Sequence, residues 1–205
     1  MAVADYEEHL RDTASCIVAF ASGDSNVIPD VPNFEFGASL ERLGVSYVLM
    51  RDSTGNWYHR GIEGIGGVAE VARYIARLRP RYRRVVTTGV SFGSYGALLY
   101  GQMAAADEVT VFSPLTVLGR RAPEEFDPVW HHRVRSHLDL DLKPYFPHGP
   151  IPFTRAFVSD GDGAELDDTM ARRIGIEHVR LIPGHSHAGL ARAMREEGWF
   201  ERLYP

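Results

Sequence analysis

The sequence lacks several features that would point to a specialised class of protein. The 205-residue chain has one cysteine, Cys16, so it cannot form an intrachain disulfide. It contains no run of about 18 apolar residues, which excludes a predicted membrane span. The formal net charge of −5 gives no electrostatic basis for binding nucleic acid. The acidic segment 1–8 has no basic region followed by an apolar stretch, so it does not resemble a signal peptide. We therefore expect a cytoplasmic globular protein.

The remaining composition is that of one ordinary domain. Hydrophobic residues make up 44% of the chain and charged residues 24%. A chain of this length can bury a core as a single domain, which we expect to span residues 1–205. Short β-branched and apolar runs alternate with helical patterns, which predicts an α/β fold with a mostly parallel sheet flanked by helices. The predicted strands are 16–21, 45–50, 85–88, 108–112, 155–159 and 178–182.

One stretch combines a strand, a tight turn and a helix around a serine. Residues 85–88 are β-branched and suit a buried strand. Gly89, Ser91 and Gly93 then match the pattern G-x-S-x-G, and a small-residue helical segment follows over 96–106. Glycines two residues on either side of a serine in a sharp turn leave room for the backbone. The pattern therefore predicts a nucleophile elbow, with a glycine-rich turn of any parallel α/β protein as the alternative.

Ser94 is a second serine in this stretch. It falls in the first helical turn, where a small residue is needed for close packing. We therefore predict Ser91 rather than Ser94 as the nucleophile.

This segment resembles the elbow of the α/β-hydrolase fold. The resemblance implies that the backbone N–H of Phe92 donates to an oxyanion, and that the loop after the first strand supplies a second donor. In this chain that loop begins with Ser22 and Gly23, where the family commonly has a His-Gly pair. The second donor is therefore expected at Ser22 or Gly23.

The same resemblance implies an acid and a base later in the chain. The family places the acid just after the strand at 155–159; direct placement selects Asp160, and the common family spacing selects Asp162. Both remain open. The family places its histidine about four residues after a proline such as Pro183, which selects His187, with His185 as the second choice. The chain order of serine, aspartate and histidine is that of α/β-hydrolases.

Two further segments are candidates for binding substrate. The proline-rich stretch at about 115–154 lies where the family inserts caps, so it is expected to form a small lid, with Trp130 contributing apolar surface. Trp57, Tyr58 and His59 lie on a loop at the expected functional edge. They are expected either to line a pocket or to anchor their own loop. The histidines near Trp130 fit no strong metal-ligand spacing, so no metal and no cofactor is predicted.

Together these residues predict a serine hydrolase of carboxylic esters or related acyl bonds, acting on a small molecule. His187 would take the proton of Ser91, and the carboxylate would orient the imidazole. Two other functions are compatible with the same residues. One is a hydrolase-fold protein that binds a small molecule or partner without turnover, and the other is an acyltransferase that uses the same serine. The sequence leaves open whether the chain forms a homo-oligomer.

Overall fold

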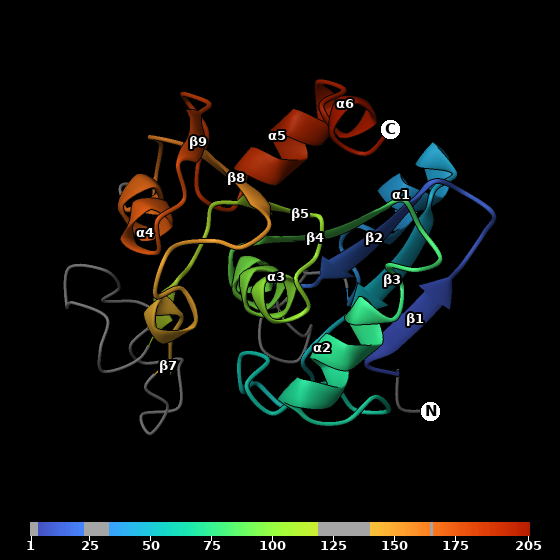
Figure 1. The fold of residues 1–205 in the computed structure, drawn as a ribbon. Helices are drawn as coiled ribbons and strands as arrows, with labels where there is room; N and C mark the ends of the chain where they lie inside the picture. Colours follow the sequence, from blue (N-terminus) through green and yellow to red (C-terminus); the bar gives the residue numbers. More distant parts are fainter. Residues whose placement is uncertain (1–3, 23–32, 119–139, 165) are drawn as a thin grey trace.

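The computed structural model describes residues 4–22, 33–118, 140–164 and 166–205. Within them, one seven-stranded sheet has the order β1-β3-β2-β4-β5-β8-β9 (Figure 1). Strand β1 pairs antiparallel with β3, and every other pairing in this sheet is parallel. The strands are β1 (Tyr6–His9), β2 (Ser15–Phe20), β3 (Ser46–Met50), β4 (Arg84–Val90), β5 (Glu108–Phe112), β8 (Phe153–Val158) and β9 (His178–Leu181).

The predicted α/β class with a mostly parallel sheet is confirmed, and so are its six predicted strands. Strand β1 was not predicted, because its Tyr-Glu-Glu-His sequence carries charge and lies on the edge of the sheet. A polar edge strand leaves no apolar run in the sequence. The core strands were predictable because each is buried on both faces.

Alternate residues of each central strand enter two separate cores. In β2, Val18 and Phe20 face one cluster, and Ile17 and Ala19 face the other. Helices α2, α3 and α4 contribute to the first cluster, and α1, α5 and α6 contribute to the second. The helices are α1 (Gly37–Leu43), α2 (Val68–Ala76), α3 (Phe92–Met103), α4 (Asp167–Arg173), α5 (Leu190–Glu196) and α6 (Phe200–Leu203).

Cys16 lies in the first core and is fully buried. Burial raises the pKa of its thiol to about 12. A thiol with such a pKa is not a nucleophile near neutral pH, so Cys16 is a packing residue.

The described parts of the segment predicted as a lid contain three short elements. Strands β6 (Val117–Leu118) and β7 (Leu140–Asp141) form an antiparallel pair, and the short 3₁₀ helix η3 (Lys143–Tyr145) follows. Asp141 also forms an ion pair with Arg173 of α4. Residues 119–139, including Trp130, lie outside the described part of the chain.

The topology brings the loops that follow the parallel strands to one edge of the sheet. Strands β4, β5, β8 and β9 are parallel neighbours, so their carboxyl ends lie side by side. Ligands bind at this edge in open parallel sheets. Among the described residues, no helix is both long and apolar enough to cross a bilayer.

Candidate functional site

Ser91 occupies a strained turn between β4 and α3. Its φ and ψ are 51° and −118°, values that a residue with a side chain rarely adopts. Its backbone N–H donates to the carbonyl of Phe112 in β5, at 3.0 Å. The strand, turn and helix predicted around Ser91 are present, although α3 begins at Phe92, earlier than the pattern suggested. The turn exposes the Ser91 side chain at the carboxyl edge of the sheet.

The two glycines of the pattern allow this turn to form. A Cβ added to Gly89 would overlap the backbone of Gly93. A Cβ added to Gly93 would overlap the carbonyl oxygen of Phe20 in β2. The elbow therefore packs backbone against backbone, and neither position has space for a methyl group.

This packing predicts a large loss of stability for Gly93→Ala. The added methyl would have to displace β2 from α3, so the free energy of unfolding should fall by about 3 kcal/mol, at the upper end for overpacking. Urea denaturation measures this change. Gly67→Ala is the matched control, since its Cβ meets only the movable carboxylate of Glu70, at 3.0 Å. Equal stability of the two variants would contradict the prediction.

His187 reaches Ser91 from the loop after β9. Its Nε2 lies 2.9 Å from the Ser91 Oγ, within hydrogen-bond distance. The backbone N–H of His187 donates to the carbonyl of Asp162, at 3.1 Å, and the N–H of Gly161 donates to the carbonyl of His185, at 3.0 Å. These two bonds join the loop after β8 to the loop after β9, and they fix the backbone from which the imidazole extends.

Asp167 occupies the other side of the imidazole. Its Oδ1 lies 2.7 Å from His187 Nδ1, and its side chain is 3% exposed, against 17% for His187. The other carboxylate oxygen, Oδ2, is buried without a hydrogen-bond partner in the described structure. Ser91, His187 and Asp167 therefore form a continuous chain of hydrogen bonds, with the carboxylate at its buried end.

The prediction that Asp160 or Asp162 pairs with the histidine is wrong. Asp160 accepts a hydrogen bond from the N–H of Gly184 at 2.7 Å, and Asp162 contributes only its backbone carbonyl to His187. Both sit in the loop immediately after β8, whereas Asp167 begins α4. In the sequence, Asp167 and Asp168 form a pair of acids that is typical of a helix N-terminus. The sequence does not show that the first of these acids, Asp167, is buried at 2% exposure in the folded protein.

Ser94 and His185 have structural contacts instead. The Ser94 hydroxyl donates to the carbonyl of Ser91 and accepts from the N–H of Leu115, and the side chain is fully buried. His185 binds through its backbone, with its N–H donating to Ser159 Oγ at 3.0 Å. The structure therefore brings His187 rather than His185 to Ser91, as predicted from the sequence.

The loop after β2 differs from the expected arrangement at Ser22. The backbone N–H of Ser22 donates to Glu35 Oε2 at 2.7 Å, and its hydroxyl donates to Glu35 Oε1 at 2.6 Å. In this structure the N–H of Ser22 is therefore committed to a carboxylate and does not face an oxyanion. Burial raises the pKa of Glu35, and the two hydrogen bonds from Ser22 oppose part of that rise. Gly23 lies outside the described residues. Phe92 begins α3 directly after Ser91, so its predicted role as a donor stays a prediction.

The loop with Trp57, Tyr58 and His59 is anchored in the core. Trp57 and Tyr58 both have positive φ, at 53° and 65°, and both are buried. The Tyr58 hydroxyl donates to the carbonyl of Ala21 at 2.6 Å, and the Trp57 ring contacts Phe92. These contacts favour the hypothesis that Trp57 and Tyr58 anchor their own loop over the hypothesis that they line a pocket.

His59 alone of the three is partly exposed. Its Nε2 lies 2.7 Å from the Tyr95 hydroxyl, and burial lowers the pKa of the imidazole. A neutral imidazole is therefore favoured beside the phenol. No group of three potential metal-ligating side chains occurs in the described part of the chain.

Comparison with known proteins identifies the fold. No protein-family model matches the sequence, and no curated protein matches it. Solved structures do match. The capsule O-acetyltransferase of Neisseria meningitidis serogroup A is 11% identical, with a TM-score of 0.67 over 97% of this chain and 89% of that one.

Two hydrolase structures match over similar lengths. A thermophilic esterase from Thermogutta terrifontis, with butyrate bound, is 16% identical, with a TM-score of 0.55 over 94% of this chain and 84% of that one. An alpha-beta serine hydrolase homologue from Coxiella burnetii is 14% identical, with a TM-score of 0.53 over 95% and 86%. The chain has the α/β-hydrolase fold.

Proposed function

We propose that this protein is a serine hydrolase of carboxylic esters or related acyl bonds. The observation that supports it best is the position of His187, which bridges the Ser91 hydroxyl and the buried Asp167 carboxylate at 2.9 and 2.7 Å. A serine, a base and an orienting acid in this order define the catalytic triad by geometry and role. Asp167 takes the place that the sequence had given to Asp160 or Asp162.

In the proposed mechanism, Ser91 Oγ attacks the acyl carbonyl while His187 Nε2 accepts its proton. Asp167 accepts a hydrogen bond from Nδ1, which fixes the tautomer and stabilises the imidazolium as it forms. The backbone N–H of Phe92 donates to the developing oxyanion, a contact worth roughly 3 kcal/mol per donor. His187 then returns the proton to the leaving group, and water releases the acyl group by the same steps.

Ser22 could supply the second oxyanion donor only after its present hydrogen bond is broken. Its N–H becomes available only when Glu35 releases it, since the carboxylate now accepts that hydrogen bond. Glu35, from the segment before α1, holds the loop after β2 through both of its contacts with Ser22. Substrate binding would have to move Glu35 or take its second donor from elsewhere.

Labelling with a fluorophosphonate tests the nucleophile. A serine activated by a histidine attacks such a probe, so the wild-type protein should be labelled at Ser91. Ser91→Ala should abolish the label with the fold retained, as judged by circular dichroism. Ser94→Ala is the matched control and should keep the label, because Ser94 faces Leu115 rather than His187. Equal labelling of wild type and Ser91→Ala would contradict the proposal.

Acyl transfer is the second candidate. The same serine, base and acid would form the acyl-enzyme, and an alcohol would replace water as the acceptor. The matching capsule O-acetyltransferase has this fold over nearly its whole length, and the fold itself does not decide between the two acceptors. The partition of acyl product between water and an added alcohol, such as glycerol, separates them.

A further inference from the structure

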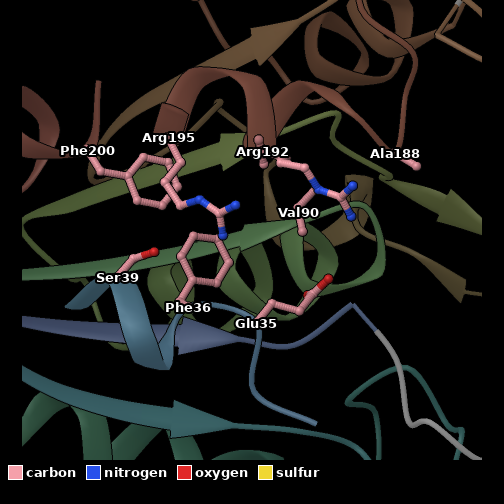
Figure 2. A pocket seen from close by; sticks show the side chains of 9 residues that line it. Glu35, Phe36, Ser39, Val90, Ala188, Arg192, Arg195 and Phe200 are labelled. Atoms are coloured by element: carbon pink, nitrogen blue, oxygen red, sulfur yellow. The ribbon is translucent and has the colours of Figure 1, made fainter. Parts of the chain in front are cut away.

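A cavity of about 140 Å³ opens beside the proposed catalytic residues. It lies between α5 and the segment leading into α1, on the second-core face of the sheet (Figure 2). Two of its lining residues, Val90 and Ala188, directly adjoin Ser91 and His187 in the chain. Since consecutive Cα atoms are about 3.8 Å apart, the cavity lies within one residue of the backbone of both Ser91 and His187. The lining residues are Glu35, Phe36, Ser39, Val90, Ala188, Ala191, Arg192, Arg195 and Phe200.

Two arginines supply the charge of this cavity. Arg192 and Arg195 are three residues apart on α5, so they share one face of the helix. Figure 2 shows both side chains extending from α5 toward Val90 and Phe36. The Arg192 guanidinium makes no hydrogen bond or ion pair with any residue that the structure describes. Arg195 has one loose contact, 3.6 Å from the exposed carboxylate of Glu196.

Glu35 is the acidic residue of the cavity lining, and its carboxylate is hydrogen-bonded to Ser22. Both of its carboxylate oxygens accept hydrogen bonds from Ser22. The lining thus carries two guanidinium groups against one carboxylate, which leaves it positive even when Glu35 is ionised. Phe36, Val90 and Phe200 provide the apolar floor. Guanidinium groups over an apolar floor suit a short aliphatic chain that ends in an anion.

We propose that this cavity binds an anionic group, a carboxylate or a phosphate, on the substrate that Ser91 attacks. The proposal rests on the proposed hydrolase function and adds a substrate class to it. Arg192 and Arg195 each offer a planar fork of N–H donors that matches either anion. At about 140 Å³ the cavity has room for such a group with a few methylenes. Esters that carry one negative charge near the scissile bond should therefore be preferred over neutral esters of the same length.

The test compares matched pairs of esters. On the acyl side, p-nitrophenyl hydrogen adipate is paired with p-nitrophenyl hexanoate. On the leaving-group side, 4-acetoxybenzoate is paired with 4-acetoxybenzamide. For each pair the ratio of kcat/KM, anionic over neutral, is measured after subtraction of spontaneous hydrolysis. Charge-assisted hydrogen bonds at a partly exposed site support a preference of about tenfold.

The variants are Arg192→Gln alone and together with Arg195→Gln. We expect the preference to fall severalfold in the single variant and about tenfold in the double variant. Arg172→Gln is the matched control, because it removes the same charge from an exposed arginine of α4 that pairs with Asp168. It should keep the wild-type ratio. The pair of esters that responds identifies which side of the substrate carries the anion.

Two outcomes overturn the proposal. One is a wild-type ratio near one in both pairs, and the other is a ratio that the double variant leaves unchanged. If no ester is hydrolysed at all, the proposed function fails separately, and binding decides the inference. Adipate and inorganic phosphate are each titrated into the wild type and the double variant by isothermal calorimetry. For at least one of the two ligands, the dissociation constant should be about tenfold higher for the double variant than for the wild type. Equal binding to both proteins would overturn the cavity assignment, whatever the activity.

Discussion

His187→Ala is expected to lower kcat for ester hydrolysis by roughly 10⁶-fold. A coupled serine and base act as a unit, so the loss of either removes most of what both contribute. His187 Nε2 lies 2.9 Å from the Ser91 hydroxyl and is the base that the structure places on that oxygen. The measurement is steady-state hydrolysis of a p-nitrophenyl ester, with spontaneous hydrolysis subtracted. KM should change far less than kcat, because the proton transfer matters in the transition state.

His185→Ala provides the control for this prediction. It removes an imidazole two residues away, and the contacts of His185 to Ser159 and Gly161 run through its backbone. Its activity should therefore stay within a few-fold of wild type. If His185→Ala lost as much activity as His187→Ala, the assignment of His187 as the base would be contradicted. Retained activity in His187→Ala would exclude the proposed mechanism.

Asp167→Asn should lower kcat by about 10⁴-fold, the scale on which neutralising a triad carboxylate acts. An asparagine fills the same space and can turn its amide N–H₂ toward His187 Nδ1. The imidazole would then hold its proton on Nε2, which faces Ser91, and could not accept the serine proton. Crystallisation or circular dichroism of the variant would show that the fold persists while activity is lost.

Asp160→Asn and Asp162→Asn separate geometry from the sequence-based expectation. Asp160 interacts with the N–H of Gly184, and Asp162 serves His187 through its backbone carbonyl, which the substitution leaves in place. Both variants should keep activity within about tenfold of wild type. If either variant lost about 10⁴-fold in kcat while Asp167→Asn stayed active, the acid would be Asp160 or Asp162 and not Asp167.

The elbow and the sheet were predictable because their causes are local. Residues 85–88 are β-branched, and glycines flank Ser91 at fixed spacing, so the strand and the turn are set by neighbouring residues. His187, by contrast, was selected by the spacing after Pro183 that the resemblance to the α/β-hydrolase family implies. The strand and the turn need no knowledge of distant contacts.

The acid and the oxyanion loop were not predictable in the same way. Asp167 reaches His187 only because the chain continues past two nearer aspartates and returns at the start of α4. Likewise, the N–H of Ser22 donates to Glu35, a residue 13 positions further along the chain, and no local pattern links the two. Both pairings depend on how loops fold over the sheet. Several aspartates follow the same strand, and the local sequence does not show which of them pairs with His187.

The position of β9 at the edge of the sheet affects the stability of the loop that carries His187. Strand β9 is short, largely exposed and pairs only with β8 within the described sheet, whereas β4 lies in its middle. Ser91 therefore follows a buried central strand, and His187 follows an exposed strand at the edge of the sheet. Such edges open locally at a lower free energy than the whole domain. We therefore expect local opening of the β8–β9 edge, which would break the hydrogen bonds of His187 to the loop after β8, to remove the proposed base while the strand and turn around Ser91 stay intact.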